Sequence, residues 1–392
     1  MLTGLRIIDL SRVLSGPYCT ALLADLGAEV IKIESPEGDD ARHFGPHLDG
    51  VSLYFSMINR NKQSLALNLR DARAQAIVAE LAATADVVVE NFRPGVARRL
   101  GVDHETLRGI NPRLVYLSIS GFGQTGPSAS LPAYDLIIQA MSGIMSITGD
   151  PDGPPTAVGE SIGDLWTGLF GSWSILAALQ ARTRTGIGDY IDLAMFDSML
   201  AMQVTGLSQL RFSGQAPRRV GSRHPVTTPV DAFAAADGYV TIVVPTQDLF
   251  ARLCEVMGRP ELTNDPRFHD GPARRASEPA LRALIAAWMA PLAVEDVVAR
   301  CRERDIPAGA VLDLAQSLQS EQAQARQVAT TVPHPVFGEI GMVTQPARFA
   351  SGGTVAASRE PTLGEHGDAV LRRLLGRTDE ELAALREAKV LR

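Results

Sequence analysis

The chain has 392 residues, of which 45% are hydrophobic and 21% charged, a composition typical of a soluble globular protein with room for two domains. Its formal net charge of −7 argues against nucleic acid or an anionic membrane as the main partner, although a polyanionic small ligand requires only a local cluster of arginines. The three cysteines, Cys19, Cys254 and Cys301, are widely spaced, which disfavours disulfides and structural zinc and indicates a reducing cytoplasm.

The N-terminal part alternates between strand and helix signals. Short runs rich in β-forming residues predict strands at 6–10, 29–34, 86–90 and 113–119, with helices at 17–26 and 68–84. This alternation predicts an α/β fold in which helices flank a mostly parallel, Rossmann-like sheet. Ligands of such sheets bind at the carboxyl ends of the strands, so the candidate loops follow Leu10, Ile33, Glu90 and Ile119. The standard dinucleotide and P-loop glycine fingerprints are absent.

The pattern of alternating strand and helix signals ends at about residue 200. Residues 206–224 are rich in glycine and basic side chains and are interpreted as a linker or site loop. A hairpin at 231–244, turned at Asp237-Gly238, and helices near 249–257, 279–289 and 294–304 predict a smaller α/β domain at 225–325. Residues 326–392, with a strand-like run at 341–343 and a helix at 365–375, are expected to return to a large domain formed with residues 1–205.

Asp164 stands between a glycine-rich loop and an apolar helix predicted at 165–181. Asp is a preferred helix N-cap, and that structural role alone would explain its position. A carboxylate beside flexible glycines and apolar surface is, however, also suited to act as a nucleophile. Leu165, Trp166 and Phe170 could form an apolar wall that excludes water, or could simply belong to the core, as aromatic residues at this spacing more often do. The helix falls short of the ~20 residues that a membrane span requires, so no membrane segment is predicted.

Several ordered motifs together resemble those of a known family. They are Ser15-Gly16-Pro17, residues 28–34 (AEVIKIE), 59–69 (NRNKQSLALNL) and 90–95 (ENFRPG), Gly163-Asp164, and residues 361–366 (PTLGEH). At these spacings the whole chain is similar to the family III CoA-transferases of the formyl-CoA and carnitine type. The resemblance implies a CoA-ester transferase that forms an intertwined homodimer, with no metal and no tightly bound cofactor, because coenzyme A or acyl-CoA is its substrate.

The resemblance also implies roles for individual residues. Asp164 would be the catalytic carboxylate, which forms an aspartyl-acyl anhydride and then an aspartyl-CoA thioester. The residues implied for binding CoA are Val13, Leu14, Ser35, Leu67, Asn68, Leu69, Arg70, Asn91, Phe92, Arg93, Arg99, Ala133 and Tyr134. Alternatively, Arg70 could pair with acids on its own helix, and Arg98 and Arg99 could form a solvated face. Backbone N–H groups of residues 121–124 are a candidate for oxyanion binding.

Departures from formyl-CoA transferase affect the expected substrate. That enzyme has basic residues where Ser35 and Pro132 stand here, and its polyglycine lid has no equivalent run. We therefore expect an acceptor other than oxalate or formate. Arg223 or His224 could hold the second carboxylate of a dicarboxylic acid, or could be solvated charges of the linker.

Two alternatives to CoA transfer remain at this stage. The α-methylacyl-CoA racemases share the N-terminal resemblance, but they use a His acid/base where Tyr134 stands here, and a phenol with an ordinary pKa near ~10 is a poor base at neutral pH. A non-catalytic CoA-binding protein would keep the nucleotide pocket and leave Asp164 without a role. The favoured prediction is transfer of CoA from an acyl-CoA, with succinyl-CoA as the first donor to test, to a carboxylic acid.

Overall fold

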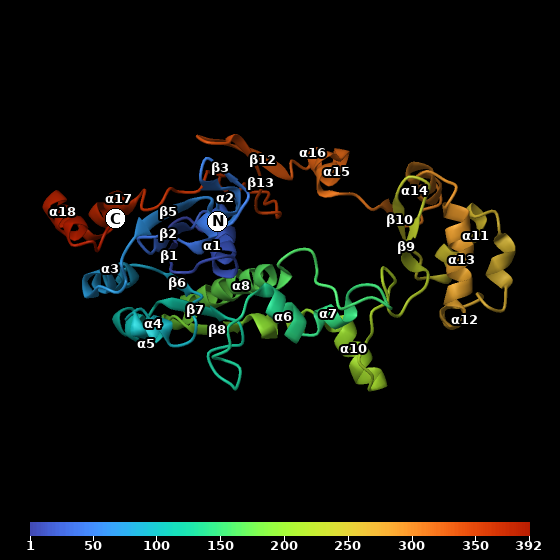
Figure 1. Cartoon of the computed structure of the whole chain (residues 1–392), viewed down its shortest axis with the longest axis horizontal. Helices are drawn as coiled ribbons and strands as arrows, with labels where there is room; N and C mark the ends of the chain where they lie inside the picture. The colour runs from blue at the N-terminus through green and yellow to red at the C-terminus, as the bar shows by residue number, and fades with distance from the viewer. The chain divides into compact units, whose positions relative to one another are not determined.

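The computed structural model describes residues 1–392, which form two compact units (Figure 1). The first unit comprises Met1–Ile144, Val158–Val204 and Gln322–Arg392, and the second comprises Met145–Ala157 and Thr205–Glu321. The short segment Met145–Ala157 carries no pattern that separates it from its neighbours, and the sequence interpretation left it in the large domain. The expected linker at 206–224 also contains most of a helix, α10 (Val204–Ser213).

A six-stranded parallel sheet forms the centre of the first unit, in the order β5-β2-β1-β6-β7-β8. The strands are β1 (Arg6–Asp9), β2 (Glu29–Glu34), β5 (Lys62–Ala66), β6 (Val87–Glu90), β7 (Val115–Ser120) and β8 (Tyr190–Ala194). The predicted α/β class with a parallel sheet is confirmed. The sequence patterns did not predict β5, because its polar Lys62 and Ser64 interrupt the apolar run although both are buried in the fold.

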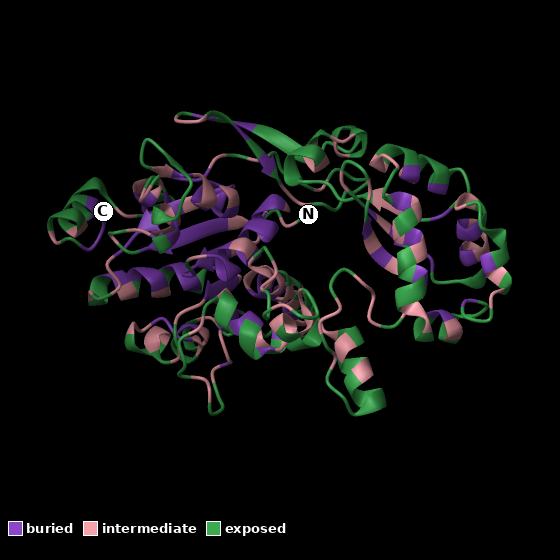
Figure 2. Ribbon diagram, turned by 45° about the vertical axis from the view of Figure 1, so that its right-hand side comes forward, coloured by how far each residue is buried: buried purple, intermediate pink, exposed green.

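Helices cover both faces of this sheet, because successive side chains along a strand point to opposite faces. Ile7 of β1 packs in a core with α1 (Ser15–Asp25), α6 (Asp135–Met141), α8 (Ile162–Thr185) and α9 (Met195–Ala201). Its neighbour Ile8 packs on the other face with α3 (Ala72–Ala83), α5 (His104–Ile110), α17 (Gly367–Leu375) and α18 (Asp379–Glu387). Figure 2 shows the sheet as the most completely buried part of the first unit.

Two predicted helix boundaries are wrong. The helix expected from residue 68 begins at Ala72, because the Asp71 side chain accepts a hydrogen bond from the Arg73 N–H and caps it. The helix expected at 165–181 is α8, which has 24 residues. By length and composition alone α8 could therefore cross a membrane. It packs against α1, α6, α9 and β7, as a core helix does.

The second unit has its own core, around an antiparallel three-stranded sheet in the order β11-β10-β9. The hairpin predicted at 231–244 is present as β9 (Val230–Ala234) and β10 (Tyr239–Val243). The other elements of this core are β11 (Ala308–Ala310), η2 (Pro260–Asn264), α11 (Gln247–Val256), α13 (Glu278–Met289) and α14 (Val294–Arg302). The short helix α12 (Gly271–Ala276) precedes α13.

Short elements complete the chain. Two two-stranded sheets pair β3 (His47–Leu48) with β4 (Val51–Ser52), and β12 (Ala329–His334) with β13 (Gly338–Val343). The short helices are η1 (Asp40–His43), α2 (Leu53–Asn59), α4 (Val96–Arg99), α7 (Ile144–Ile147), α15 (Leu314–Gln319) and α16 (Glu321–Ala325). At the C-terminus, Leu391 forms a β-bridge with Leu67, so the last residues lie beside the end of β5.

Candidate active site

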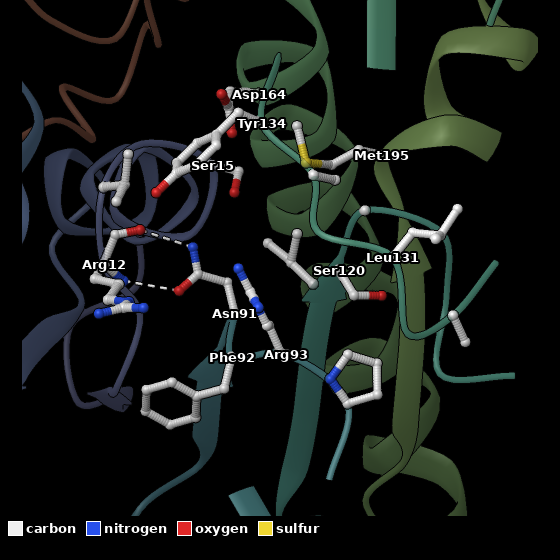
Figure 3. Close-up of a pocket in the computed structure, with 16 residues that line it drawn as sticks. Arg12, Ser15, Asn91, Phe92, Arg93, Ser120, Leu131, Tyr134, Asp164 and Met195 are labelled. Atoms are coloured by element: carbon white, nitrogen blue, oxygen red, sulfur yellow. Dashed lines mark hydrogen bonds between the residues drawn. The ribbon is translucent and has the colours of Figure 1, made fainter. Parts of the chain in front are cut away.

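A pocket opens at the carboxyl end of the parallel sheet, between the ends of β1 and β6 (Figure 3). The chain runs outward from β1 through β2 to β5 on one side and from β6 through β7 to β8 on the other. Such a reversal of strand order is where α/β sheets bind ligands. The predicted residues that line the pocket are Val13, Asn91, Phe92, Arg93, Ala133, Tyr134 and Asp164. Gly121, from the candidate oxyanion-binding loop, lines it as well. Residues not predicted from sequence also line it: Arg12, Ser15, Pro94, Ile119, Ser120, Ala129, Leu131 and Met195.

The loop after β1 is tied to the loop after β6. The Arg12 N–H donates to Asn91 Oδ1 at 2.8 Å, and Asn91 Nδ2 donates back to the Arg12 carbonyl at 2.7 Å. The next residue, Val13, has φ of 69°, a left-handed conformation that costs free energy for a β-branched residue. Its N–H donates to Asp39 Oδ1 at 3.0 Å, which helps to hold this strained backbone at the pocket wall.

A buried ionic network supports the same loop from below. Lys62 Nζ lies 3.0 Å from Asp9 Oδ2, and Lys32 Nζ lies 2.8 Å from Asp39 Oδ2, with all four side chains almost fully buried. Lys32 Nζ also donates to the Ser11 carbonyl at 2.8 Å. Burial alone would raise the pKa of Asp9, but the charges of Lys62 and Lys32 and hydroxyl hydrogen bonds outweigh it and lower that pKa to about 2. The loop after β1 is therefore held by a buried network whose charged side chains are all paired.

The Asp164 side chain belongs to the first turn of α8 and does not cap the helix. The helix begins at Ile162, and Ser161 at the N-cap position makes no side-chain capping bond. The capping acceptor comes instead from α6: Asp135 Oδ1 accepts from the Gly163 N–H at 2.7 Å and from the Asp164 N–H at 3.3 Å. The N-cap interpretation of Asp164 is therefore wrong, and its carboxylate is available to the pocket.

The environment of Asp164 changes its acidity. Burial, and next the negative charge of Asp135, raise the pKa of Asp164 to about 7. Hydrogen bonding from the hydroxyl and the backbone N–H of Ser15 opposes this rise. Ser15 is the first residue of α1, which packs against α8, and Figure 3 shows Ser15 and Asp164 in the same pocket. Near neutral pH the site thus holds a carboxylate that is ionised in a large fraction of molecules and only partly hydrated, the condition of a reactive nucleophile.

Comparison with known proteins identifies the family. Residues 2–367 match the family described as CoA-transferase family III. A protein of Acetobacter aceti named acetyl-CoA:oxalate CoA-transferase is 48% identical over 83% of this chain and 84% of its own length. The succinate–glutarate CoA-transferase of Agrobacterium fabrum is 38% identical over 95% of both chains. A solved structure described as a CaiB/BaiF family protein from Brucella suis has a TM-score of 0.86 at 38% identity, covering 95% of this chain and 99% of that one.

The chain belongs to CoA-transferase family III. It is therefore an enzyme of the CoA-transferase class, which uses CoA thioesters as substrates. The resemblance inferred from its motifs is confirmed.

Other residues implied for CoA binding in this CoA-transferase lie outside the pocket. Ser35 and residues 67–70 follow β2 and β5, at the same edge of the sheet. The side chains of Leu14 and Leu67 are buried in apolar cores, so only their backbones can face a ligand. Arg70 and Arg99 are exposed and their side chains make no ion pair, whereas Arg98 pairs with Glu105. The alternative that Arg70 pairs with acids of its own helix is therefore wrong, because Asp71 pairs with Arg73.

The apolar wall expected beside Asp164 is also wrong in its residues. Trp166 and Phe170 line a separate apolar cavity with Leu169, Trp173 and Met202, and Leu165 packs against the core around α2. A helical spacing fixes which residues share a helix face, but only the packing decides which face meets the pocket. The apolar side chains that do line the CoA-transferase pocket are Val13, Phe92, Pro94, Ile119, Ala129, Leu131, Ala133 and Met195.

Three further candidate residues, Gln124, Arg223 and His224, are already engaged within the protein. The Gln124 N–H donates to both carboxylate oxygens of Asp192, at 3.2 and 3.0 Å, which removes it from the proposed oxyanion donors. Arg223 donates to the Val220 carbonyl and lies 3.3 Å from Glu278, and the His224 ring accepts from two backbone N–H groups. Both side chains thus have structural partners in the second unit.

Proposed function

We propose that this enzyme moves coenzyme A from an acyl-CoA to a carboxylic acid through covalent intermediates on Asp164. The observation that carries the proposal is the Asp164 carboxylate itself. It stands in the pocket at the reversal of strand order, with its pKa raised to about 7 and with Ser15 as a hydrogen-bond donor beside it. A carboxylate in this setting can attack a thioester and preserve the energy of the bond as an anhydride.

The proposed reaction has two symmetrical halves. The ionised carboxylate of Asp164 attacks the thioester carbonyl, the C–S bond breaks, and CoA leaves as the thiolate while an aspartyl-acyl anhydride forms. The thiolate then attacks the aspartyl carbonyl of the anhydride, which releases the first carboxylate and leaves CoA as a thioester on Asp164. An incoming carboxylate reverses these steps and departs as the new acyl-CoA. No proton or electron has to be supplied from outside.

Charged and apolar groups around the pocket support this chemistry. The Arg93 side chain lines the pocket and makes no ion pair, so it is available to a substrate carboxylate or to CoA. We propose that Arg70 and Arg99 contact CoA phosphates, because unpaired guanidinium groups bind phosphate in bidentate geometry. Together with Asn91, Phe92, Ala133 and Tyr134 they would form the coenzyme site.

The choice of donor and acceptor is narrowed by the relatives. The Acetobacter protein is named for acetyl-CoA and oxalate, and the Agrobacterium protein for succinate and glutarate. We propose succinyl-CoA as the first donor to test and a short carboxylic acid as acceptor. The sequence departures led us to expect an acceptor other than oxalate, but a 48% identical relative with that name places oxalate on the acceptor panel beside glutarate.

Racemisation at the α-carbon is the second candidate reaction. Tyr134 lines the pocket near Asp164 (Figure 3), where the racemase interpretation requires a His base. We expect no deuterium wash-in at the α-carbon of a branched acyl-CoA in D₂O when no acceptor acid is present. Wash-in without acyl exchange would favour the racemase.

We propose that the enzyme acts as a homodimer. Large apolar side chains are exposed on two neighbouring helices of the first unit: Leu136, Ile137 and Met141 of α6 and Leu169 and Trp173 of α8. An apolar surface of this kind supports burial by a second copy.

The covalent route is tested by mass spectrometry of enzyme that is quenched during turnover. Incubation with succinyl-CoA and no acceptor should add the mass of CoA, less water, to the peptide that contains Asp164. The Asp164→Asn variant should show neither the adduct nor transfer, while a control variant, Asp152→Asn at an exposed position of the second unit, should show both. Product accumulation with Asp164 always unmodified would contradict the proposal.

A further inference from the structure

We propose that Asp135 is a positioning residue for CoA transfer: its carboxylate closes the N-terminus of α8 and thereby fixes Asp164 in the pocket. This inference rests on the proposed role of Asp164. Asp135 is the first residue of α6 and directly follows Tyr134, which lines the pocket. Two consecutive residues thus have different roles: Tyr134 lines the pocket, and Asp135 binds the N-terminus of α8.

Both oxygens of Asp135 are engaged, so the side chain has one defined orientation. Oδ1 accepts from the backbone N–H groups of Gly163 and Asp164, at 2.7 and 3.3 Å. Oδ2 accepts from Gln139 Nε2 at 2.7 Å. The shorter Oδ1 contact holds the backbone of Gly163, and the longer one holds the backbone of Asp164 itself. Both satisfy N–H groups that would otherwise lack a partner at the start of the helix.

Gln139 extends the same support to the loop that precedes Asp164. It is 2% exposed, and it donates to the Glu160 carbonyl at 3.2 Å and accepts from the Val158 N–H at 2.9 Å. The whole glycine-rich loop is therefore attached to α6 through Asp135 and Gln139. Without these contacts, a loop of this composition would leave the carboxylate of Asp164 free to move, and a misplacement of 1 Å can cost two orders of magnitude in rate.

Gly163 permits the close approach of the two segments. A Cβ atom at residue 163 would lie 2.9 Å from Asp135 Oδ1, closer than such atoms pack. Replacement of Gly163 by Ala would therefore push the Asp135 carboxylate away from α8 while leaving both acids in the chain. This variant therefore tests whether activity depends on the position of the Asp135 carboxylate, because the charge of Asp135 is retained.

The charge of Asp135 has a second effect on the site. The positive end of the α8 dipole would by itself favour ionised Asp164 and make it a weaker nucleophile. Asp135 neutralises that end and repels the Asp164 charge. The other polar groups around this end of α8 are Ser15 of α1, which hydrogen-bonds to Asp164, Tyr54 of α2, on which the charges of Asp164 and Glu160 act, and the pocket-lining Tyr134, Arg12 and Arg93. Of all these groups and Asp135, only Asp135 hydrogen-bonds to the backbone N–H of Asp164.

The test compares the pH dependence of turnover in matched cap variants. Asp135→Asn keeps one acceptor oxygen and removes the charge, and Asp103→Asn does the same at the N-cap of α5, which is outside the pocket. We expect Asp135→Asn to shift the acid limb of kcat/KM downward by about one pH unit and to lower its plateau about tenfold. Gly163→Ala should lower kcat by about 10- to 100-fold with little change in KM, and Asp103→Asn should leave both parameters unchanged.

An unchanged acid limb and plateau in Asp135→Asn would overturn the inference, as would an equal effect of Asp103→Asn, which would indicate a loss of general stability only. The acid limb of the pH profile of kcat/KM is measured from turnover alone. It therefore tests the role of Asp135 whether or not the covalent adduct is observed. Failure of the adduct experiment alone would count against the covalent route and not against Asp135.

Discussion

At the scale of the residue, the acidity of Asp164 links function to stability. Its pKa is about 7 in the fold against an ordinary value of 3.8, so between those pH values the unfolded chain is ionised while the folded chain keeps the proton. Above pH 7 the folded protein must hold a charge that its surroundings disfavour. Stability from this group is therefore present at low pH and is lost as pH rises from about 4 to 7.

Replacement of Asp164 by Asn should consequently abolish transfer and stabilise the fold. At pH 8 we expect the free energy of unfolding to rise by about 1–2 kcal/mol, a value discounted because the side chain is only half-buried. The gain should largely disappear near pH 4, where Asp164 of the folded wild type is neutral, as Asn is. Urea unfolding at the two pH values measures it, with Asp152→Asn as the surface control. Equal stability of Asp164→Asn and wild type at pH 8 would show that the surroundings of Asp164 do not disfavour its ionised form.

Two adjacent arginines provide a matched test of CoA binding. Arg99 makes no ion pair, while Arg98 is paired with Glu105, and both are exposed. We expect Arg99→Gln to raise KM for acyl-CoA about tenfold with kcat nearly unchanged, because a phosphate contact contributes equally to the ground and transition states. Arg98→Gln should change KM less than twofold. Steady-state kinetics at low and high salt will show whether the difference is electrostatic; equal effects would argue for a general change in surface charge.

At the scale of the element, the crossing of α1 and α8 places Ser15 beside Asp164. A Cβ atom at Gly168 of α8 would lie 2.6 Å from the Ser15 carbonyl oxygen, so the two helices touch backbone to backbone. Gly168→Ala should force them apart, lower the free energy of unfolding by about 1–3 kcal/mol and reduce kcat, because Ser15 moves with α1. Gly109→Ala in α5, where a Cβ meets open space, should leave kcat unchanged and slightly stabilise the helix. Unchanged kcat in Gly168→Ala would show that Ser15 is not needed at this position.

At the scale of the whole molecule, the proposed dimer is tested by sedimentation equilibrium at micromolar concentration. We expect twice the mass of a single chain, because the exposed apolar side chains of α6 and α8 would otherwise face water. Trp173, which is 65% exposed, is the most informative position, and Trp173→Glu should weaken association or cause aggregation. Leu314→Glu, at an exposed residue of the second unit, is the control. A stable wild-type monomer would contradict the dimer.

The sequence by itself determined the α/β class, most strands of the parallel sheet and the loops at their carboxyl ends, because these depend on local hydrophobic patterns and on the polarity of parallel strands. Its motifs also indicated the family and Asp164. Only the tertiary structure decided that Asp135 rather than Asp164 caps α8, that Lys62 is the buried ionic partner of Asp9, and that Trp166 and Phe170 line a different pocket from Asp164. Each of these outcomes depends on contacts between residues far apart in the chain, such as Asp135 with Gly163 and Asp9 with Lys62, and no local pattern of residues records which distant group will supply a cap, a counter-charge or a pocket wall.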